Sequence, residues 1–207
     1  MQGMYIKRHN AAVTMVTAAI AKGARGGCYM VMDACAEEDT PSFSAGTRLP
    51  AWLLPTVPKE IRKKMRPDLL VIPGIPLAVG TRARYPGPSA DQRRNLTVHI
   101  VELGYTGDLR HAEKQHDKAV QHRQLMQALQ DHGWTVRYTP REAISLGVGG
   151  TVRKDLKQLL MDMGTTAAEA SQCSSTLHHH AVTALNDMVK CRRFMERSQQ
   201  GTAPGVG

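Results

Sequence analysis

Aromatic residues make up only 4% of the 207 positions in this sequence. Proteins that hold single-stranded nucleic acid regardless of its sequence stack successive bases on several aromatic rings. With so few rings available, base stacking is not the binding mode we expect of this chain. Zinc-site spacing is absent as well, since the four cysteines are scattered and no two form a CxxC pair. We expect these cysteines to be reduced, buried thiols.

Long apolar runs are also missing. A helix that crosses a bilayer needs about 20 consecutive apolar residues, and the most apolar stretch, residues 11–21, is shorter and contains threonines. No segment at the N-terminus has the basic start and apolar centre of a secretory signal. We therefore expect an intracellular protein with no membrane partner.

Acidic residues are outnumbered, with 18 Asp and Glu against 27 Lys and Arg, for a net charge of +9. A basic surface attracts polyanions, because neutralised phosphates release their counterions. Basic side chains are dense between residues 59 and 94, where few acids oppose them. Seven of these basic residues are expected to contact nucleic acid: Lys63, Lys64, Arg66, Arg82, Arg84, Arg93 and Arg94.

Hydrophobic residues, at 42%, are sufficient for one domain with a substantial core. Their periodicity predicts helices and strands in alternation. The predicted helices cover residues 5–22, 109–131, 152–163 and 167–196, and the predicted strands cover residues 28–32, 68–73, 97–105, 134–138 and 144–148. This order indicates an α/β domain in which helices flank a mixed sheet and a long helix connects two strands.

Two acidic residues stand on predicted strands. Asp68 follows Pro67 at the start of one strand, and Glu102 lies between Val101 and Leu103 in the strongest one. Carboxylates at neighbouring strands can hold a divalent cation, which prefers oxygen ligands. Such a cation can activate water and stabilise charge that builds on a phosphate. The alternative is that Asp68 caps a turn and Glu102 faces solvent.

The predicted long helix that follows Glu102 has a buried stripe that changes character along its length. Leu125 and Leu129 lie on this stripe. The residues that precede them on the same face, at intervals of three or four positions, are polar. These are His122, Lys118, Gln115 and His111. A charged residue on a core-facing stripe needs a partner or a function, and Lys118 or His122 could orient water or a phosphate. Alternatively the helix end overhangs the sheet into water, and Lys114, on the flank, remains a second candidate lysine.

These residues together resemble a known family. The order Arg66-Pro67-Asp68, then Val101-Glu102, then a helix with Lys118 and His122, resembles the restriction-like endonuclease domain of site-specific non-LTR retrotransposons. Arg8-His9-Asn10, with the apolar helix around it, resembles the segment between the zinc knuckle and the nuclease core of those proteins. The resemblance covers about residues 5–163.

The resemblance implies a PD-(D/E)xK restriction-endonuclease-like core that nicks target DNA with Mg²⁺ or Mn²⁺. The free 3′ end then primes reverse transcription. Asp68 and Glu102 would be the metal ligands, Lys118 would match a displaced catalytic lysine, and His122 would stand where the family often has tyrosine. The implied partners are target DNA, the element's RNA and an upstream reverse transcriptase domain, and the implied location is the nucleus. The implied divisions are residues 1–50 as a lead-in, 51–163 as the nuclease-like core and 164–207 as a C-terminal helix with a frayed tail.

The sequence departs from the family pattern at several points. Gly104 occupies the position two residues after Glu102, where a lysine is usual. The interval from Asp68 to Glu102 is long, which leaves Asp91 or Asp108 as alternative second acids. No reverse transcriptase palm and no zinc knuckle precede the core, so the chain would be a fragment, a truncated gene model, or a decayed or domesticated copy.

Two other functions stay open. The first is a nuclease fold that has lost catalysis and still binds DNA. The second is an α/β protein in which the turn at residues 147–150 holds a phosphorylated small molecule, although the spacing of the known phosphate loops is absent.

Overall fold

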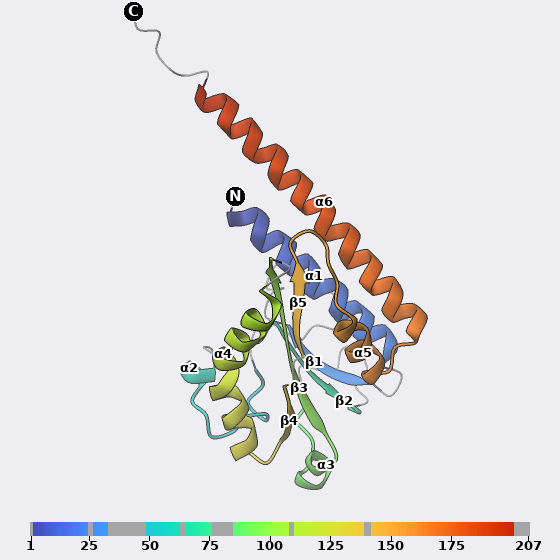
Figure 1. Ribbon diagram of the computed structural model, residues 1–207. Helices are drawn as coiled ribbons and strands as arrows, with labels where there is room; N and C mark the ends of the chain where they lie inside the picture. Colours follow the sequence, from blue (N-terminus) through green and yellow to red (C-terminus); the bar gives the residue numbers. More distant parts are fainter. Residues whose placement is uncertain are drawn as a thin grey trace, which may run out of the picture.

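The computed structural model of the chain describes residues 2–24, 27–32, 49–62, 65–75, 85–107, 110–138 and 142–200. The helices are α1 (Gln2–Gly23), α2 (Lys59–Arg62), α3 (Ala90–Arg94), α4 (His111–Asp131), α5 (Lys154–Asp162) and α6 (Ala167–Gln200). The strands are β1 (Cys28–Met32), β2 (Leu69–Pro73), β3 (Thr97–Thr106), β4 (Thr135–Arg137) and β5 (Ala143–Gly147). Figure 1 shows their arrangement.

The five strands form one mixed sheet in which β3 is central. Strands β1, β2 and β3 are antiparallel neighbours. The first residues of β3 pair with β4 and its last five pair with β5, both in parallel. A parallel pair needs a crossover connection, and α4 is the crossover from β3 to β4. The prediction of an α/β domain with a mixed sheet flanked by helices is confirmed.

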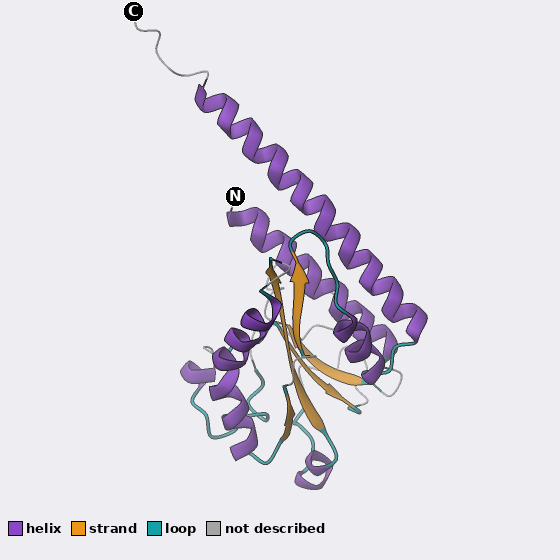
Figure 2. Cartoon of the chain, viewed as in Figure 1, coloured by secondary structure: helices purple, strands orange, loops and turns teal. Residues whose placement is uncertain are grey.

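Helices cover both faces of the sheet (Figures 1 and 2). Alternate residues of a strand point to opposite faces, and β3 follows this rule. Val101 and Leu103 pack with α1, α5 and α6, whereas Val98 and Ile100 pack with α4 and the segment that follows residue 49. Leu53, in the segment that follows residue 49, is fully buried in this second layer.

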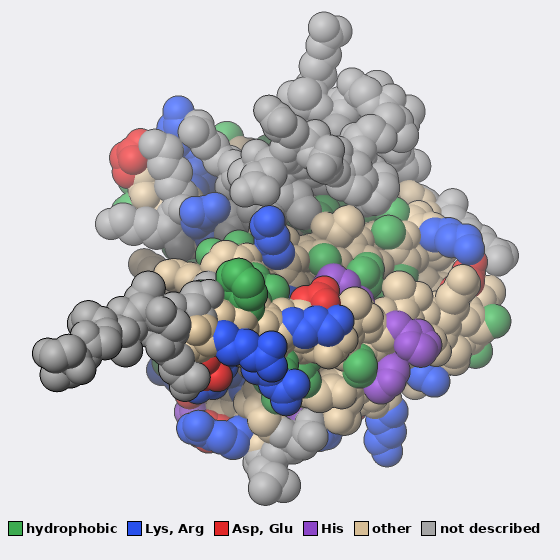
Figure 3. Space-filling model, turned by 90° about the horizontal axis from the view of Figure 1, so that it is seen from above, with side chains coloured by type: hydrophobic (Ala, Val, Ile, Leu, Met, Phe, Trp, Pro, Cys, Tyr) green, Lys and Arg blue, Asp and Glu red, His purple; other side chains and the backbone are tan. Residues whose placement is uncertain are grey.

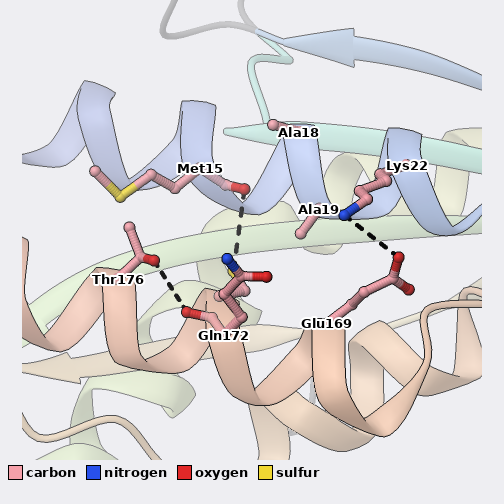
Figure 4. Close-up of a pocket in the computed structure, with 8 residues that line it drawn as sticks. Met15, Ala18, Ala19, Lys22, Glu169, Gln172 and Thr176 are labelled. Atoms are coloured by element: carbon pink, nitrogen blue, oxygen red, sulfur yellow. Dashed lines mark hydrogen bonds and ion pairs between the residues drawn. The ribbon is translucent and has the colours of Figure 1, made fainter.

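Helix α6 lies beside α1 and runs in the opposite direction (Figure 4). Ala18 and Ala19 line a cavity of about 270 Å³ between the two helices, and the Lys22 ammonium lies 3.5 Å from a Glu169 carboxylate oxygen. Burial raises the pKa of the Cys173 thiol to about 11, so this thiol remains protonated at neutral pH. The far part of α6 extends beyond the start of α1 (Figure 1). Within the described ranges, no helix has the length and apolar character that a bilayer crossing requires.

The predicted strands and long helices are all present, with ends displaced by a few residues. The short helix α3 was not among the predicted elements. Ser89 accepts a hydrogen bond from the Gln92 backbone, and the Gln92 side chain accepts one from the Ser89 backbone. This reciprocal capping box starts a short helix, and its signal was present in the sequence. The end of the predicted C-terminal tail lies outside the described residues.

A glycine at the end of α1 allows the closest approach between α1 and the turn before α6. A Cβ atom at Gly23 would lie 2.7 Å from the backbone nitrogen of Thr165. We predict that Gly23→Ala lowers the free energy of unfolding by roughly 2 kcal/mol, because a backbone clash cannot be relieved by a side-chain rotation. Denaturant unfolding followed by circular dichroism measures this. Gly3→Ala is the matched control, since no atom lies within 4 Å of its Cβ position; equal stability of the two variants would contradict the prediction.

Candidate active site

The register of the sheet brings Asp68 and Glu102 together. Leu69 pairs with Val101 in antiparallel strands, so the next pair outward is Asp68 with Glu102. Each carboxylate also accepts a hydrogen bond from the backbone beside the other acid. The Asp68 backbone N–H donates to Glu102 Oε1 at 2.8 Å, and the Leu103 N–H donates to Asp68 Oδ2 at 2.8 Å. The long interval between the two acids in the sequence is therefore spanned by a strand pairing, and both predicted acids lie in one site.

Helix α4 adds a cation to this pair. The Lys118 ammonium lies 2.7 Å from Glu102 Oε2 and 4.0 Å from Asp68 Oδ2. Burial alone would lower the pKa of Lys118, but the two carboxylates outweigh it, and the net pKa is raised. Lys118 is therefore a charged counterion placed between two carboxylates. The polar half of the helix stripe does face the sheet, as the sequence predicted.

Helix α1 supplies a contact whose role the sequence did not reveal. The His9 Nε2 atom lies 3.0 Å from Asp68 Oδ1. Burial raises the pKa of Asp68, but the hydrogen bond and charge of His9, the charge of Lys118 and the Leu103 N–H together hold it below its usual value. The only sequence signal was the Arg8-His9-Asn10 motif, which was noted as part of the resemblance without a role in the site.

His122 and Tyr138 lie beside Glu102. The His122 Nε2 atom is 2.8 Å from Glu102 Oε1, although the ring is not aligned for a hydrogen bond. The His122 and Tyr138 rings are 6.2 Å apart between centroids. Burial raises the pKa of Tyr138, and the carboxylates of Glu102, Asp68 and Glu142 raise it further. The phenol therefore stays protonated and keeps its proton available for donation next to the acid pair.

A third acid, Glu142, contacts Glu102 from the position just before β5. Its backbone carbonyl accepts a hydrogen bond from the Glu102 N–H at 2.9 Å. Its fully buried carboxylate lies 3.3 Å from both His99 Nδ1 and Arg137 Nε. No sequence pattern indicated this cluster, because each member is an isolated polar residue on a different strand or strand end.

The other predicted site residues are distributed over the molecule. The Lys114 side chain crosses Gly104 and lies one helical turn before Lys118. Arg66 is exposed just before Asp68. Asp91, Arg93 and Arg94 lie in α3, at the end of β3 remote from α1 and α6 (Figure 1). Outside the described residues are Lys63, Lys64, Arg82, Arg84 and Asp108.

The donor set suits a hard divalent cation. In the part of the chain that the structure describes, no three His, Cys, Asp or Glu side chains converge as metal ligands. A structural zinc site would need four such ligands. Mg²⁺, by contrast, keeps several waters and binds through one or two carboxylates together with substrate phosphates. Asp68 and Glu102 fit that second pattern.

The turn after β5 is closed, which bears on the small-molecule alternative. The Gly150 N–H donates to the Gly147 carbonyl, and His178 Nδ1 lies 2.8 Å from the Gly150 carbonyl oxygen. A Cβ at Gly150 would lie 2.8 Å from a Val182 methyl group. Helix α6 therefore packs against this glycine turn.

Comparisons with known proteins give no relative: no family model matches the chain, and no curated protein or solved structure matches it.

Loss of the Lys118 ammonium should destabilise the fold in a pH-dependent way. We predict that Lys118→Met lowers the free energy of unfolding at pH 7 by about 2–4 kcal/mol, because it leaves two neighbouring carboxylates without their cation. The loss should shrink as acid protonates the carboxylates. It should also shrink as the pH rises from about 10.4, the pKa of unfolded lysine, and vanish only above the raised pKa of folded Lys118.

Denaturant unfolding across the pH range checks this prediction. Lys157→Met on α5 serves as control, since Lys157 is an exposed lysine on the other face of the sheet. Equal effects of the two substitutions at pH 7 would show that Lys118 is not the counterion of a buried acid pair.

Proposed function

We propose that this chain is a metal-dependent endonuclease domain of a non-LTR retrotransposon protein, with a PD-(D/E)xK-type core, which nicks target DNA to prime reverse transcription. One observation carries the proposal. Asp68 and Glu102 lie opposite each other on adjacent antiparallel strands, and Lys118 reaches both. Two carboxylates and a cation at one point are the groups that metal-assisted phosphodiester hydrolysis requires.

Each side chain has a distinct role in this proposal. Asp68 and Glu102 hold Mg²⁺ or Mn²⁺, which supplies Lewis-acid stabilisation of the phosphate and a water of lowered pKa. Lys118 can donate to a phosphate oxygen or to the attacking water. His9 keeps the Asp68 carboxylate in its orientation through the 3.0 Å contact, and His122 lies close enough to Glu102 to do the same for the second carboxylate.

A nucleic-acid substrate is supported by charge. The chain carries a net charge of +9. Figure 3 looks onto the end of the molecule towards which α6 extends, and Lys and Arg side chains gather near the centre of this face around a few acidic and histidine side chains. A site with carboxylates surrounded by cationic groups suits a phosphodiester. The assignment to a retroelement, with its RNA and reverse transcriptase as partners, rests on the order of the sequence motifs.

A second candidate function is DNA binding without catalysis. The position two residues after Glu102 is Gly104 and not a lysine. The ammonium of Lys118 already forms ion pairs with both carboxylates. A protein that has lost cleavage would keep these ion pairs as structural contacts. The two candidates differ in whether metal and DNA together yield a product.

Nicking of supercoiled plasmid with Mg²⁺ or Mn²⁺ tests the proposed function. We expect wild type to convert plasmid to the nicked form, and Asp68→Asn and Glu102→Gln to lower the rate at least about a hundredfold, because each removes a metal ligand. Asp91→Asn on α3 is the matched control and should nick normally. Nicking by Glu102→Gln at the wild-type rate would remove the proposed site, and no nicking by wild type would favour the binding-only function.

Metal binding can be measured without any cleavage. We predict that Mg²⁺ at millimolar concentration raises the melting temperature of wild type, because a ligand that binds only the folded state stabilises it by mass action. Asp68→Asn should abolish the rise, and Asp91→Asn should preserve it. An equal rise in all three proteins would place the bound ions elsewhere.

A further inference from the structure

An arginine next to the candidate site is buried without a counterion. Arg8 on α1 is 3% exposed, and its guanidinium carbon lies 3.9 Å from the ring centroid of Tyr105 on β3. Its Nε and Nη1 atoms are shielded from solvent and have no hydrogen-bond partner within the described ranges. No ion pair joins Arg8 to any acid in the same ranges. Stacking on Tyr105 compensates only part of the cost of removing this cation from water.

A lysine on the opposite face of the same strand is also unpaired. The Lys114 side chain runs across Gly104, and a Cβ at Gly104 would lie 3.0 Å from Lys114 Cε. Gly104 does not have a positive φ, so its backbone conformation does not require glycine. Glycine is favoured here because a side chain would occupy the space that the Lys114 side chain takes. Among the described residues the Lys114 ammonium has no ion pair, in contrast to Lys118 one turn further on. The end of β3 is therefore flanked on both faces by a cation that has no acidic partner.

A small polar cavity of about 200 Å³ lies at this strand end. It is lined by Tyr105, Thr106, Arg110, Glu113, Lys114 and Asp117. Glu113 is neutralised by Arg110 through two side-chain hydrogen bonds, and Asp117 is exposed. Lys114 lines this cavity directly, so an anion bound there would compensate its charge. Arg8 does not line the cavity, but it is buried against the Tyr105 ring on the other face of β3 and adds positive charge behind the cavity wall.

We propose that this cavity is a phosphodiester subsite that holds the DNA backbone beside the phosphate cleaved at Asp68 and Glu102. Lys114 contacts the phosphate, and Arg8 fixes Tyr105 and adds positive charge behind it. Gly104 and Tyr105 lie two and three residues from Glu102 in an extended strand, which is roughly 7–10 Å. Successive phosphates of one strand rise about 3.4 Å along the duplex axis and lie further apart than that through space, so this span reaches a phosphate next to the one cleaved. The proposal rests on the proposed function in taking the same DNA as the ligand.

Binding of a fluorescein-labelled DNA duplex, followed by anisotropy in EDTA over a series of salt concentrations, tests the subsite without cleavage. We expect Lys114→Gln to weaken binding about tenfold and to reduce the slope of log K against log salt by about 0.9, the value for one lost phosphate contact. Lys157→Gln on α5 removes the same charge at an exposed position and should leave affinity and slope near wild type. Arg8→Gln should act like Lys114→Gln; if it fails to fold, the Lys114 variant alone decides the outcome.

A double-mutant cycle separates the subsite from a general charge effect. Gly104→Ala should weaken DNA binding in the wild-type background, because the added methyl group displaces the Lys114 side chain. In the Lys114→Gln background it should have no further effect, since the ammonium that the methyl group would displace is already gone. Additive effects of the two substitutions would contradict a role for Gly104 in placing Lys114.

The outcomes distinguish this inference from the proposed function. Wild-type affinity and salt slope in Lys114→Gln would overturn the subsite even if the protein nicks DNA. Lys114-dependent binding by a protein that does not nick would support the subsite while removing the endonuclease.

Discussion

The structure depends on a pair of like charges that the backbone places side by side. Antiparallel pairing of β2 with β3 sets Asp68 opposite Glu102, and Glu102 is 1% exposed. Two carboxylates so close and so little hydrated would repel each other strongly unless a cation stood between them. Lys118 meets that need from α4, and His9 contributes from α1. The positions of both helices are therefore tied to the electrostatics of one point on the sheet.

This constraint links layers that otherwise have separate cores. Helix α1 packs on one face of the sheet and α4 on the other, yet both direct a polar side chain to the same acid pair. His9 can do so because Asp68 precedes the first residue of β2 and lies at the end of the strand. Glu142, just before β5, adds a further contact, since its carbonyl accepts a hydrogen bond from the Glu102 N–H. The chemistry of the site is thus assembled from the sheet and both helical layers.

Sequence patterns were sufficient to predict the four longer helices, the strands and four residues of the site, Asp68, Glu102, Lys118 and His122, but not the short helices α2 and α3. Asp68 and Glu102 stood out as acids on apolar strands, and Lys118 as a charge on a buried stripe. His9 could not be assigned a role, because its contact depends on how α1 crosses the end of the sheet, which local pattern does not encode. Glu142 was missed for a similar reason, since its partners, His99 and Arg137, come from other strands. From the sequence, Gly104 was interpreted only as the absence of a lysine. In the structure the Lys114 side chain passes over Gly104, where a larger residue would obstruct it.

The contact between α1 and α6 joins the earliest and the latest helices of the chain. Val13, Val16 and Ile20 on α1 share one core with Ala170 and Leu177 on α6. Helix α1 is therefore held between the sheet and α6, and the same helix carries His9, which contacts Asp68. Through α1, the packing of the last helix thus reaches a contact of the candidate site.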